Sequence, residues 1–538
     1  MATRYTSDEL KNMSSDAKDI LIISLQDQLD RLNENIESLI EQLRIATQQR
    51  FGRHTETLEA INGQLSIFNE AECVCSDDTA EPEIEDVVLC TKKRPKRKGK
   101  RDSDLADFPQ EPHLHDVSRD ELDAFYGVGN WKERPDETYK RLRFEPASWT
   151  VEVHTVKVYV GTKGDHQDEF VRGERPKDLL RNSILTPSLA AGILNGKYAN
   201  SLPYDRMAKE FESAGVNITK QSMANWTIRL ADKYLEPVCE RLKDHLLSLH
   251  VNQSDETSCQ VINDGKKPGS KSWMWVHRSG EFYKDRQIVL YEYQRGRDHH
   301  LPLEYYKDFK GILVTDGLAQ YHLVDKKLPN VTNANCWVHA RRDFSDAVKA
   351  CADPEKAKQS VAYQALLRMG SIFNLDKSFR DLSSEERLKQ RQKTVKPLVD
   401  EFFAWIKEQL ATTLPKGKTA DGLNYCVNQE QYLRVFLTHG DVPMDNSASE
   451  RSIRTFCIGK KNWMFFDSVR GAKASAIIYS LSETAKLNGL RVYKYFEYLL
   501  TELPKLCDEN GNIEKTKLDS LMPWSPEIPD DCKKPQKP

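Results

Sequence analysis

At 538 residues the chain is too long for one compact core, and its length indicates roughly three or four domains. Charged residues make up 30% of the sequence, but the formal net charge is only −3, so the overall charge does not point to a polyanionic partner. The N-terminus is polar and no apolar run reaches the roughly 18 residues of a membrane span, so we expect neither a signal peptide nor a membrane segment. The 11 cysteines are scattered without the paired spacing of a zinc site, which predicts a reduced, cytoplasmic protein.

The first predicted element is a helix within residues 15–50. Its leucines and isoleucines recur at spacings of three and four residues, at Ile22, Leu25, Leu29, Leu32, Ile36, Leu39 and Leu43. Charged residues fill most of the positions between them, so the pattern is an a/d seam of about three heptads, typical of a coiled coil. The alternative is an amphipathic helix packed against its own domain. A coiled coil would make the protein a homodimer.

Residues 51–106 have the composition of a linker and include a strongly basic block. Between residues 92 and 101, eight of ten residues are basic, among them Lys92, Lys93, Arg94, Lys96 and Arg97. Such a block either contacts a polyanion such as DNA or is a solvated linker. The next segment, 107–180, contains an alternating run at 149–160. That run predicts one strand, or two joined by a bend, and hence a small β-containing module.

A helix-turn-helix is predicted at residues 186–235. A first helical run is followed by a glycine-containing turn, and Thr219 is a suitable N-cap for a second helix. In this motif the N-terminal residues of the second helix enter the major groove of DNA, so Lys220, Gln221 and Asn225 would face DNA. The alternative is an ordinary helical hairpin.

Residues 246–317 have the pattern of an α/β sheet. The predicted elements are a strand leading into Asp255, strands at 273–277 and 288–293, a short helix at 302–309 and a buried strand at 311–315. The order strand, strand, strand, helix, strand is that of a ribonuclease H-like core. A long, charge-rich and helical segment is predicted at 345–440, and helices continue to about residue 503.

Three acidic residues carry the chemical signal. Asp255 and Asp316 end strand-like runs, and Glu450 opens a helix-like run. Carboxylate oxygens suit hard divalent cations such as Mg²⁺, and two such ions can activate an attacking oxygen and stabilise a leaving one at a phosphodiester. Each acid also has a structural alternative. Asp255 could be a helix N-cap, Asp316 could belong to a plain turn, and Glu450 could close a capping box with Ser447.

Basic and aromatic residues follow Glu450 on the same helical run. Arg451, Arg454 and Lys461 would place positive charge beside phosphates. Trp463 provides a ring that can stack on an unpaired base. A helix cap does not explain these residues, which favour a nucleic-acid site.

Short motifs occur in a fixed order along most of the chain. After the N-terminal heptads they lie at residues 50–53, 64–70, 255–257, 315–321, 336–342, 445–451, 461–463 and 480–489. In this order they resemble a transposase of the insertion-sequence-66 family, a DDE-type group. The resemblance implies that Asp255, Asp316 and Glu450 are the catalytic acids. It also implies a multidomain α/β protein whose ribonuclease H-like catalytic domain spans 246–344 and 441–503, with an all-α insertion at 345–440 and a tail at 504–538.

Cys336 and His339 form another part of the resemblance. A zinc site would need two further ligands that the sequence does not offer, so we expect no zinc and assign both residues, with Asp445, a structural role beside the acids. The family usually carries a cysteine-rich zinc module between the coiled coil and the helix-turn-helix. Residues 107–163 contain no cysteine, so this module either keeps its fold without metal or has diverged.

The resemblance implies DNA transposition. The protein would bind the terminal inverted repeats of its own element, cleave phosphodiesters with metal-activated water, and use the freed 3′-hydroxyl for strand transfer. The expected cofactors are two Mg²⁺ or Mn²⁺ ions. The expected partners are double-stranded DNA, a second copy of the chain and accessory proteins of the same element, in the bacterial cytoplasm at the nucleoid. The alternatives are a catalytically inactive DNA-binding or regulatory relative, and a ribonuclease H-like nuclease without strand transfer.

Overall fold

The computed structural model describes residues 178–535, except 182, 268, 414, 509 and 510. It also describes the segments 149–151, 158–160 and 170–172 and the single positions 14, 18, 26, 120 and 128. The chain divides into two compact units, one of residues 1–64 with 178–533 and one of residues 65–177 with 534–538. Apart from the positions just named, the predicted coiled coil, linker and basic block lie outside the described residues.

The larger unit is built around a five-stranded sheet with the order β6-β5-β3-β7-β8. Its strands are β3 (Val251–Cys259), β5 (Ser272–Ser279), β6 (Val289–Gln294), β7 (Gly311–Thr315) and β8 (Val331–Asn335). Strand β5 runs antiparallel to β3 and β6, whereas β3, β7 and β8 are parallel. The predicted order of strands along the chain is confirmed. Asp255, however, lies inside β3 and not at its end, because pairing with β5 continues as far as Cys259.

The sheet separates two hydrophobic cores. Side chains alternate between the two faces of a strand, and in β5 Met274 and Val276 join one core while Trp275 joins another. The Trp275 face is covered by α10 (His300–Tyr305) and α11 (Ala319–Lys327), where Tyr305 and Tyr321 are buried. The predicted helix after β6 is therefore present, and it helps to cover this face of the sheet.

Helix α19 (Val469–Leu487) covers the outer edge of β6. The hydroxyl of Ser480 accepts a hydrogen bond from the backbone N–H of Tyr291 at 2.8 Å. The hydroxyl of Thr484 accepts from Val289 N at 3.0 Å and donates to Val289 O at 3.0 Å. An uncovered edge strand is a template for unwanted pairing, and these hydroxyls satisfy its polar groups. The motif at 480–489 thus has a structural role.

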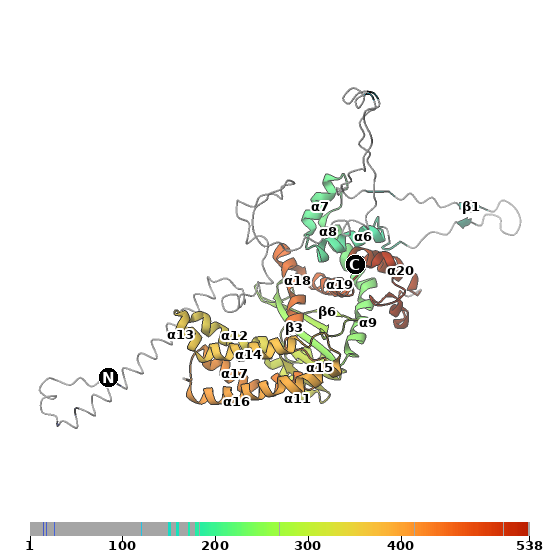
Figure 1. Cartoon of the computed structure of the whole chain (residues 1–538). Coiled ribbons are helices and arrows are strands. Elements are labelled where there is room, and N and C mark those ends of the chain that lie inside the picture. Colours follow the sequence, from blue (N-terminus) through green and yellow to red (C-terminus); the bar gives the residue numbers. More distant parts are fainter. Residues whose placement is uncertain are drawn as a thin grey trace. The chain divides into compact units, whose positions relative to one another are not determined.

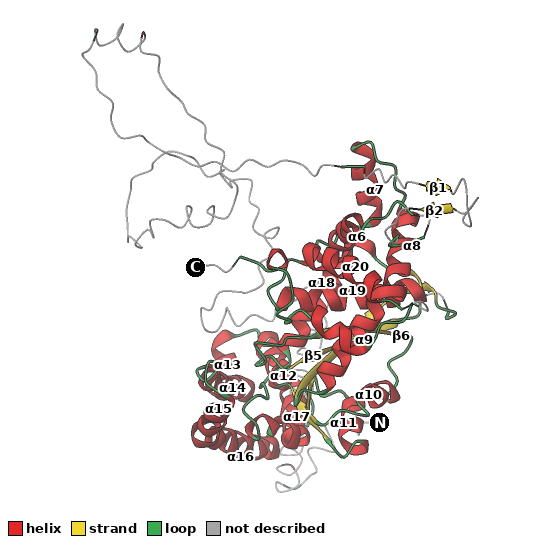
Figure 2. Ribbon diagram, turned by 90° about the vertical axis from the view of Figure 1, so that its right-hand side faces the viewer, coloured by secondary structure: helices red, strands yellow, loops and turns green. Residues whose placement is uncertain are grey.

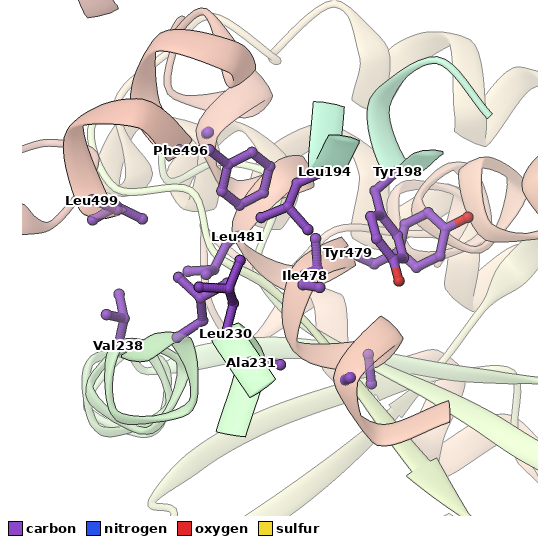
Figure 3. Close-up of a cluster of buried hydrophobic side chains, with 14 of the residues drawn as sticks. Leu194, Tyr198, Leu230, Ala231, Val238, Ile478, Tyr479, Leu481, Phe496 and Leu499 are labelled. Carbon is purple, nitrogen blue, oxygen red and sulfur yellow. The ribbon is translucent and has the colours of Figure 1, made fainter. Parts of the chain in front are cut away.

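Helices from two distant parts of the sequence share one core. The first group is α6 (Pro187–Leu194), α7 (Tyr204–Ser213), α8 (Lys220–Leu230) and α9 (Glu236–Leu247), and the second is α18 (Ser447–Trp463), α19 and α20 (Val492–Leu506). Figure 3 shows Leu194, Leu230 and Val238 gathered with Leu481 and Phe496. The predicted helix-turn-helix region therefore packs into the same unit as the sheet.

The second helix of that region begins where the sequence predicted. Gly215 lies between α7 and α8 with a φ of 81°, a left-handed conformation that glycine adopts without strain. Thr219 is the N-cap of α8, and its hydroxyl accepts from Ser222 N at 3.2 Å. This bond satisfies one of the free amides at the start of the helix.

The segment between β8 and α18 is helical, as predicted. It contains α12 (Trp337–Ala350), α13 (Pro354–Gln359), α14 (Val361–Lys377), α15 (Ser384–Gln390), α16 (Lys396–Thr412) and α17 (Lys418–Leu433). Its core includes Trp337, Phe344, Phe402 and Phe403. Figures 1 and 2 show α13–α16 together at one end of the larger unit, with α6–α8 and α18–α20 at the other. The sheet lies between the two groups.

Two short strand pairs complete the description. Strand β4 (Val261–Asn263) runs parallel to β9 (Phe466–Ser468). This pairing connects the segment after β3 with the segment after α18. In the smaller unit, β1 (Val158–Val160) pairs antiparallel with β2 (Phe170–Arg172). Within the strand predicted at 149–160, residues 158–160 form β1, residues 149–151 belong to no strand, and residues 152–157 lie outside the described residues.

Candidate active site

Asp255 and Asp316 come from adjacent parallel strands. In the β3–β7 pair Gln253 lies opposite Val314, so continuing the register by two residues sets Asp255 beside Asp316. Neighbouring strands lie roughly 4.8 Å apart, and parallel strands end at the same edge of a sheet. Asp316 directly follows β7, and its Oδ1 accepts a hydrogen bond from Leu318 N at 3.0 Å. The sheet itself brings the two predicted aspartates together.

The Asp255 side chain faces helix α18. Residues two positions before and after Asp255 share its face of the strand, because side chains alternate. Gln253 Nε2 donates to Asn446 Oδ1 at 3.2 Å, and the hydroxyl of Thr257 lies 3.7 Å from Cys457 Sγ. Asp255 lies between these two contacts and consequently points toward the same helix. Its position inside a strand also rules out the helix N-cap alternative.

Glu450 lies on the side of α18 that faces the strand. Positions 446, 450, 453 and 457 fall on one helical face, because their spacings are three and four residues. Asn446 and Cys457 contact β3, so Glu450 is directed toward the strand between them. The three predicted acids thus converge from β3, from the end of β7 and from the first turns of α18.

The capping-box alternative for Glu450 is wrong. Helix α18 begins at Ser447, its N-cap is Asn446, and the Asn446 side chain makes no capping hydrogen bond. A capping box would need Ser447 as the cap, with the glutamate at the third helical position. Ser447 is already helical, and its backbone N–H donates to Asp445 Oδ1 at 2.9 Å. Glu450 therefore lies one position too late in the helix to close the box.

Asn446 fixes the start of α18 against the sheet. Its side chain is fully buried, and its Nδ2 donates to Ser254 O at 2.8 Å. Its Oδ1 accepts from Gln253, and its backbone N–H donates to Cys336 Sγ at 3.1 Å. Within the first turn of α18, Arg278 Nη1 donates to Ala448 O at 2.9 Å. These bonds set the position from which α18 presents Glu450. The sequence analysis did not assign Asn446 a role, although it lies inside one of the matching motifs.

Cys336 and His339 lie beside the acids, where the sequence analysis gave them a structural role. Burial raises the pKa of the Cys336 thiol far above its ordinary value, so the thiol stays protonated and accepts the Asn446 amide. His339, on α12, has its Nδ1 4.0 Å from Glu450 Oε1 and its Nε2 3.2 Å from Arg342 Nη2. Cys336 thus supports the helix start, and the His339 ring flanks Glu450.

The site concentrates negative charge. Burial raises the pKa of the Asp255 carboxyl to about 8, and the charges of Glu256, Asp316 and Glu450 act in the same direction. The backbone N–H of Glu256 donates to Asp255 Oδ1 at 2.8 Å, which acts in the opposite direction. This mutual repulsion is a consequence of the proximity of the acids. It also means that a cation bound among them would stabilise the ionised form.

Glu256 is an acid of this region that the sequence analysis did not single out. It points to the opposite face of β3 from Asp255, and burial raises its pKa. Tyr321 donates its hydroxyl to Glu256 Oε2 at 2.7 Å, and Arg297 Nε donates to Oε1 at 2.8 Å. The side chain is therefore occupied by partners on the α10–α11 side of the sheet. The sequence offered one indication of Glu256, its position next to Asp255. Because side chains alternate along a strand, however, the two carboxylates lie on opposite faces of β3.

The donor set fits a hard divalent cation. Three half-buried carboxylates provide the oxygen ligands and the charge density that Mg²⁺ or Mn²⁺ requires. Among the residues that the structure describes, no three His, Cys, Asp or Glu side chains are grouped closely enough to form a ready-made metal cage. Asp255, Asp316 and Glu450 would therefore have to move closer together to share a cation.

The predicted DNA-binding residues divide into three groups. Lys220, Gln221 and Asn225 are exposed on α8, and Lys220 Nζ lies 3.5 Å from Asp205 Oδ1. On α18 the exposed cations are Arg451, Arg454 and Lys461. The basic block with Lys92, Lys93, Arg94, Lys96 and Arg97 lies outside the described residues. The first two groups are thus accessible to DNA on separate helices.

Trp463 has a structural environment. Its ring centroid lies 4.4 Å from that of Phe466 and 5.6 Å from that of Phe456. The side chain is only half-exposed, whereas the next two residues, Met464 and Phe465, are exposed. Stacking of Trp463 on a base, which the sequence suggested, would compete with these contacts.

No helix in the described part of the chain is both long enough and apolar enough to span a membrane.

Comparison with known proteins identifies the family. The family described as "Transposase IS66 family" matches residues 182–474, "IS66 C-terminal element" matches 480–524, and "Transposase C of IS166 homeodomain" matches 38–112. Three relatives from Sinorhizobium fredii (strain NBRC 101917 / NGR234), described as the uncharacterized proteins y4qI, y4hP and y4jD, are each 26% identical. The matches cover 67%, 63% and 67% of this chain and 66%, 62% and 70% of the respective relatives. The chain thus spans about two thirds of the length of these relatives. It belongs to the IS66 family of transposases.

Proposed function

We propose that the protein is an active DDE-type DNA transposase whose catalytic acids are Asp255, Asp316 and Glu450. It would bind the terminal inverted repeats of its own insertion sequence, cleave a phosphodiester at each end, and join the freed 3′-hydroxyl to target DNA. The required cofactor would be a pair of Mg²⁺ or Mn²⁺ ions held by the three carboxylates. When bound, such ions lower the pKa of an attacking water or hydroxyl and offset charge on the leaving oxygen.

One observation carries this proposal: the register of β3 with β7 and the packing of α18 on β3 support a common site for the three acids. The strand order β6-β5-β3-β7-β8, with β5 antiparallel to its neighbours, supports a ribonuclease H-like core. The helices at 345–440 would then be an insertion before the last acid. Carboxylates held on rigid elements are what precise positioning of a phosphodiester requires.

The chain's own residues would position the DNA. Arg451, Arg454 and Lys461 lie exposed on the helix that carries Glu450, so they can bind phosphates close to the acids. Phosphate contacts of this kind set the register of the DNA without reading its sequence. The bonds of Asn446 hold the start of α18, so Glu450 meets the scissile phosphate in a fixed geometry.

Recognition of the element's ends would lie elsewhere on the chain. Gln221 and Asn225 are exposed in the first two turns of α8, where a recognition helix reads bases in the major groove. The basic block at 92–101 would add sequence-independent affinity. A coiled coil at 15–50 would hold two copies together, so that both ends of the element are paired before cleavage. Accessory proteins of the same element would join this complex.

A cleavage assay tests the proposal. The substrate is a labelled duplex that carries the inverted repeat flanking the gene, incubated with and without Mg²⁺. We expect Mg²⁺-dependent cleavage by the parent and none by Asp255→Asn or Asp316→Asn, because an amide keeps the shape but removes the charge that holds a cation. The matched control is Asp381→Asn, an exposed aspartate between α14 and α15, which should cleave like the parent.

Two outcomes would overturn the proposal in different ways. Normal cleavage by Asp255→Asn would show that the acids are not the metal site. DNA binding without cleavage by the parent would favour an inactive regulatory relative. A second measurement follows the joining of the labelled end to a target plasmid, and cleavage without joining would leave a nuclease that lacks strand transfer.

A further inference from the structure

Helix α18 ends in a strained turn. Met464 follows the last helical residue with φ 68° and ψ −55°, and Phe465 N donates to Trp463 O at 2.9 Å. A hydrogen bond between residues two apart around a positive φ defines the γ-turn of the rare, strained hand. A non-glycine residue in such a conformation costs on the order of 1–3 kcal/mol and persists only where the surroundings enforce it.

The surroundings of this turn do enforce it. Trp463 on one side and Phe466 on the other pack against each other and against Phe456. The backbone N–H of Phe466 also donates to Gln260 O at 2.9 Å. Because Phe466 is buried and the half-exposed Trp463 packs on it, the two residues between them are directed outward. Met464 is 65% exposed and Phe465 46% exposed, so two large apolar side chains project from a rigid support.

A positively charged stripe leads from Glu450 to this turn. Residues 451, 454, 458 and 461 recur at spacings of three and four, so they lie on one face of α18. All four are exposed, and three of them are the cations Arg451, Arg454 and Lys461. Fourteen residues separate Glu450 from Met464, which is about 20 Å along a helix. That length corresponds to about six base-pair steps of duplex DNA.

We propose that Met464 and Phe465 form a wedge that enters the DNA and unstacks one base step about six base pairs from the scissile phosphate. This inference rests on the proposed function and adds positioning residues to it. Apolar side chains inserted between base steps kink the duplex, while neighbouring cations hold the phosphates on either side. The wedge takes the role that the sequence suggested for Trp463, and the half-exposed Trp463 ring packs behind it on Phe466 and Phe456.

The partner of this surface is duplex DNA because its charge complements the stripe. Three cations precede the turn on the exposed face of α18, as a phosphate backbone running along the helix would require. A second copy of this chain is the other partner to consider, and the test below separates the two. Either partner would cover the same apolar side chains, but only binding to DNA would produce an unstacked base.

Permanganate footprinting measures the unstacking directly, because permanganate oxidises thymines that have lost their stacking. The parent is bound to the end duplex without divalent cations, so the result does not depend on the catalytic acids. We expect one or two thymines near the sixth position from the cleavage site to become reactive. The double variant Met464→Gly with Phe465→Ala should lose this reactivity, and its DNA affinity should fall about tenfold, as for the loss of one stacked base. Glycine at 464 keeps the positive φ, so the turn should remain.

Two controls make the result specific. Phe465→Trp should keep the reactivity, because a larger ring fills the same step. Leu367→Ala removes an exposed apolar side chain from α14, far along the chain from the turn, and should behave like the parent. Thermal unfolding within a few degrees of the parent would show that the double variant is folded.

The inference is overturned if the parent produces no reactive thymine or if the double variant keeps the full reactivity. It is also overturned if the double variant changes the sedimentation mass of the free protein, since the turn would then be a contact between two copies. Failure of Mg²⁺-dependent cleavage by a parent that still unstacks DNA would refute the proposed function and leave the wedge standing.

Discussion

Replacing Asn446 with alanine should separate the placement of Glu450 from its chemistry. Asn446 is fully buried and joins α18 to β3, with Nδ2 bonded to Ser254 O and Oδ1 bonded to Gln253 Nε2. Alanine removes both bonds, so Ser254 O loses this donor, whereas Gln253 Nε2 keeps its bond to Asp445 O at 3.3 Å. No part of Asn446 has to contact the DNA for the change to affect catalysis.

The size of the effect follows from these two groups. A buried polar group that loses its partner costs about 1–3 kcal/mol. Because Gln253 Nε2 keeps its bond to Asp445 O, we expect Asn446→Ala to lower the free energy of unfolding by about 1–3 kcal/mol. A displacement of about 1 Å of a catalytic group can lower the rate about 100-fold. Asn446→Asp should be at least as harmful, because it places a carboxylate oxygen against Ser254 O and adds negative charge beside Asp255.

Three measurements on the same preparations test this reasoning. Urea unfolding gives the loss of stability, single-turnover cleavage gives the rate, and filter binding gives the DNA affinity, which should stay within about twofold of the parent. The control is Asn424→Ala on α17, where the exposed amide bonds only Ala420 O of its own helix. A destabilised Asn446→Ala that cleaves at the parental rate would refute the idea that Asn446 positions Glu450.

Further predictions concern the third acid, the DNA-reading helix and a buried lysine. Glu450→Gln should keep the fold and lose cleavage by orders of magnitude, because no capping bond depends on it; full activity would remove Glu450 from the site. Alanine at both Gln221 and Asn225 should reduce the preference for the element's ends over random DNA by about 1–3 kcal/mol per lost base contact. If a competition assay shows that the variant loses the same affinity for random DNA as for the ends, α8 has a structural role and does not read bases. Burial lowers the pKa of Lys197 to about 8, so its charged form destabilises the fold at neutral pH and this penalty fades as pH rises from about 8 to 10.5. Lys197→Met should therefore raise the free energy of unfolding at pH 7. The gain should be only about 1 kcal/mol, because the contact of the Lys197 ammonium with the Tyr204 ring at 4.1 Å offsets part of the cost of burying the charge. Chemical denaturation that shows no gain at pH 7, or the same gain at pH 10, would contradict this prediction.

Local signals in the sequence were sufficient for much of the fold. The apolar run at 311–315 has the same bounds as β7, and Thr219 caps α8 through the predicted hydroxyl bond. Both features depend on neighbouring residues only. The extent of β3 past Asp255 could not be predicted in this way, because pairing with β5 holds a polar stretch in the strand.

The parts of the site that the sequence did not reveal depend on contacts between distant residues. Asn446 looked like one polar residue among several, and its role appears only when α18 packs on β3. Trp463 was the conspicuous aromatic, but Phe456 and Phe466 bury much of its ring. Single-sequence patterns report spacing along the chain, whereas these roles follow from which surfaces meet in three dimensions.

Manganese binding tests most directly whether Asp255, Asp316 and Glu450 form one site. Mn²⁺ is titrated into the complex of the protein with its end duplex, and bound ions are counted by electron paramagnetic resonance. We expect two bound Mn²⁺ ions for the parent and for Asp381→Asn. Fewer ions, or ions that bind much more weakly, are expected for Asp255→Asn, Asp316→Asn and Glu450→Gln. Equal Mn²⁺ binding by the parent and by all three variants would contradict this expectation.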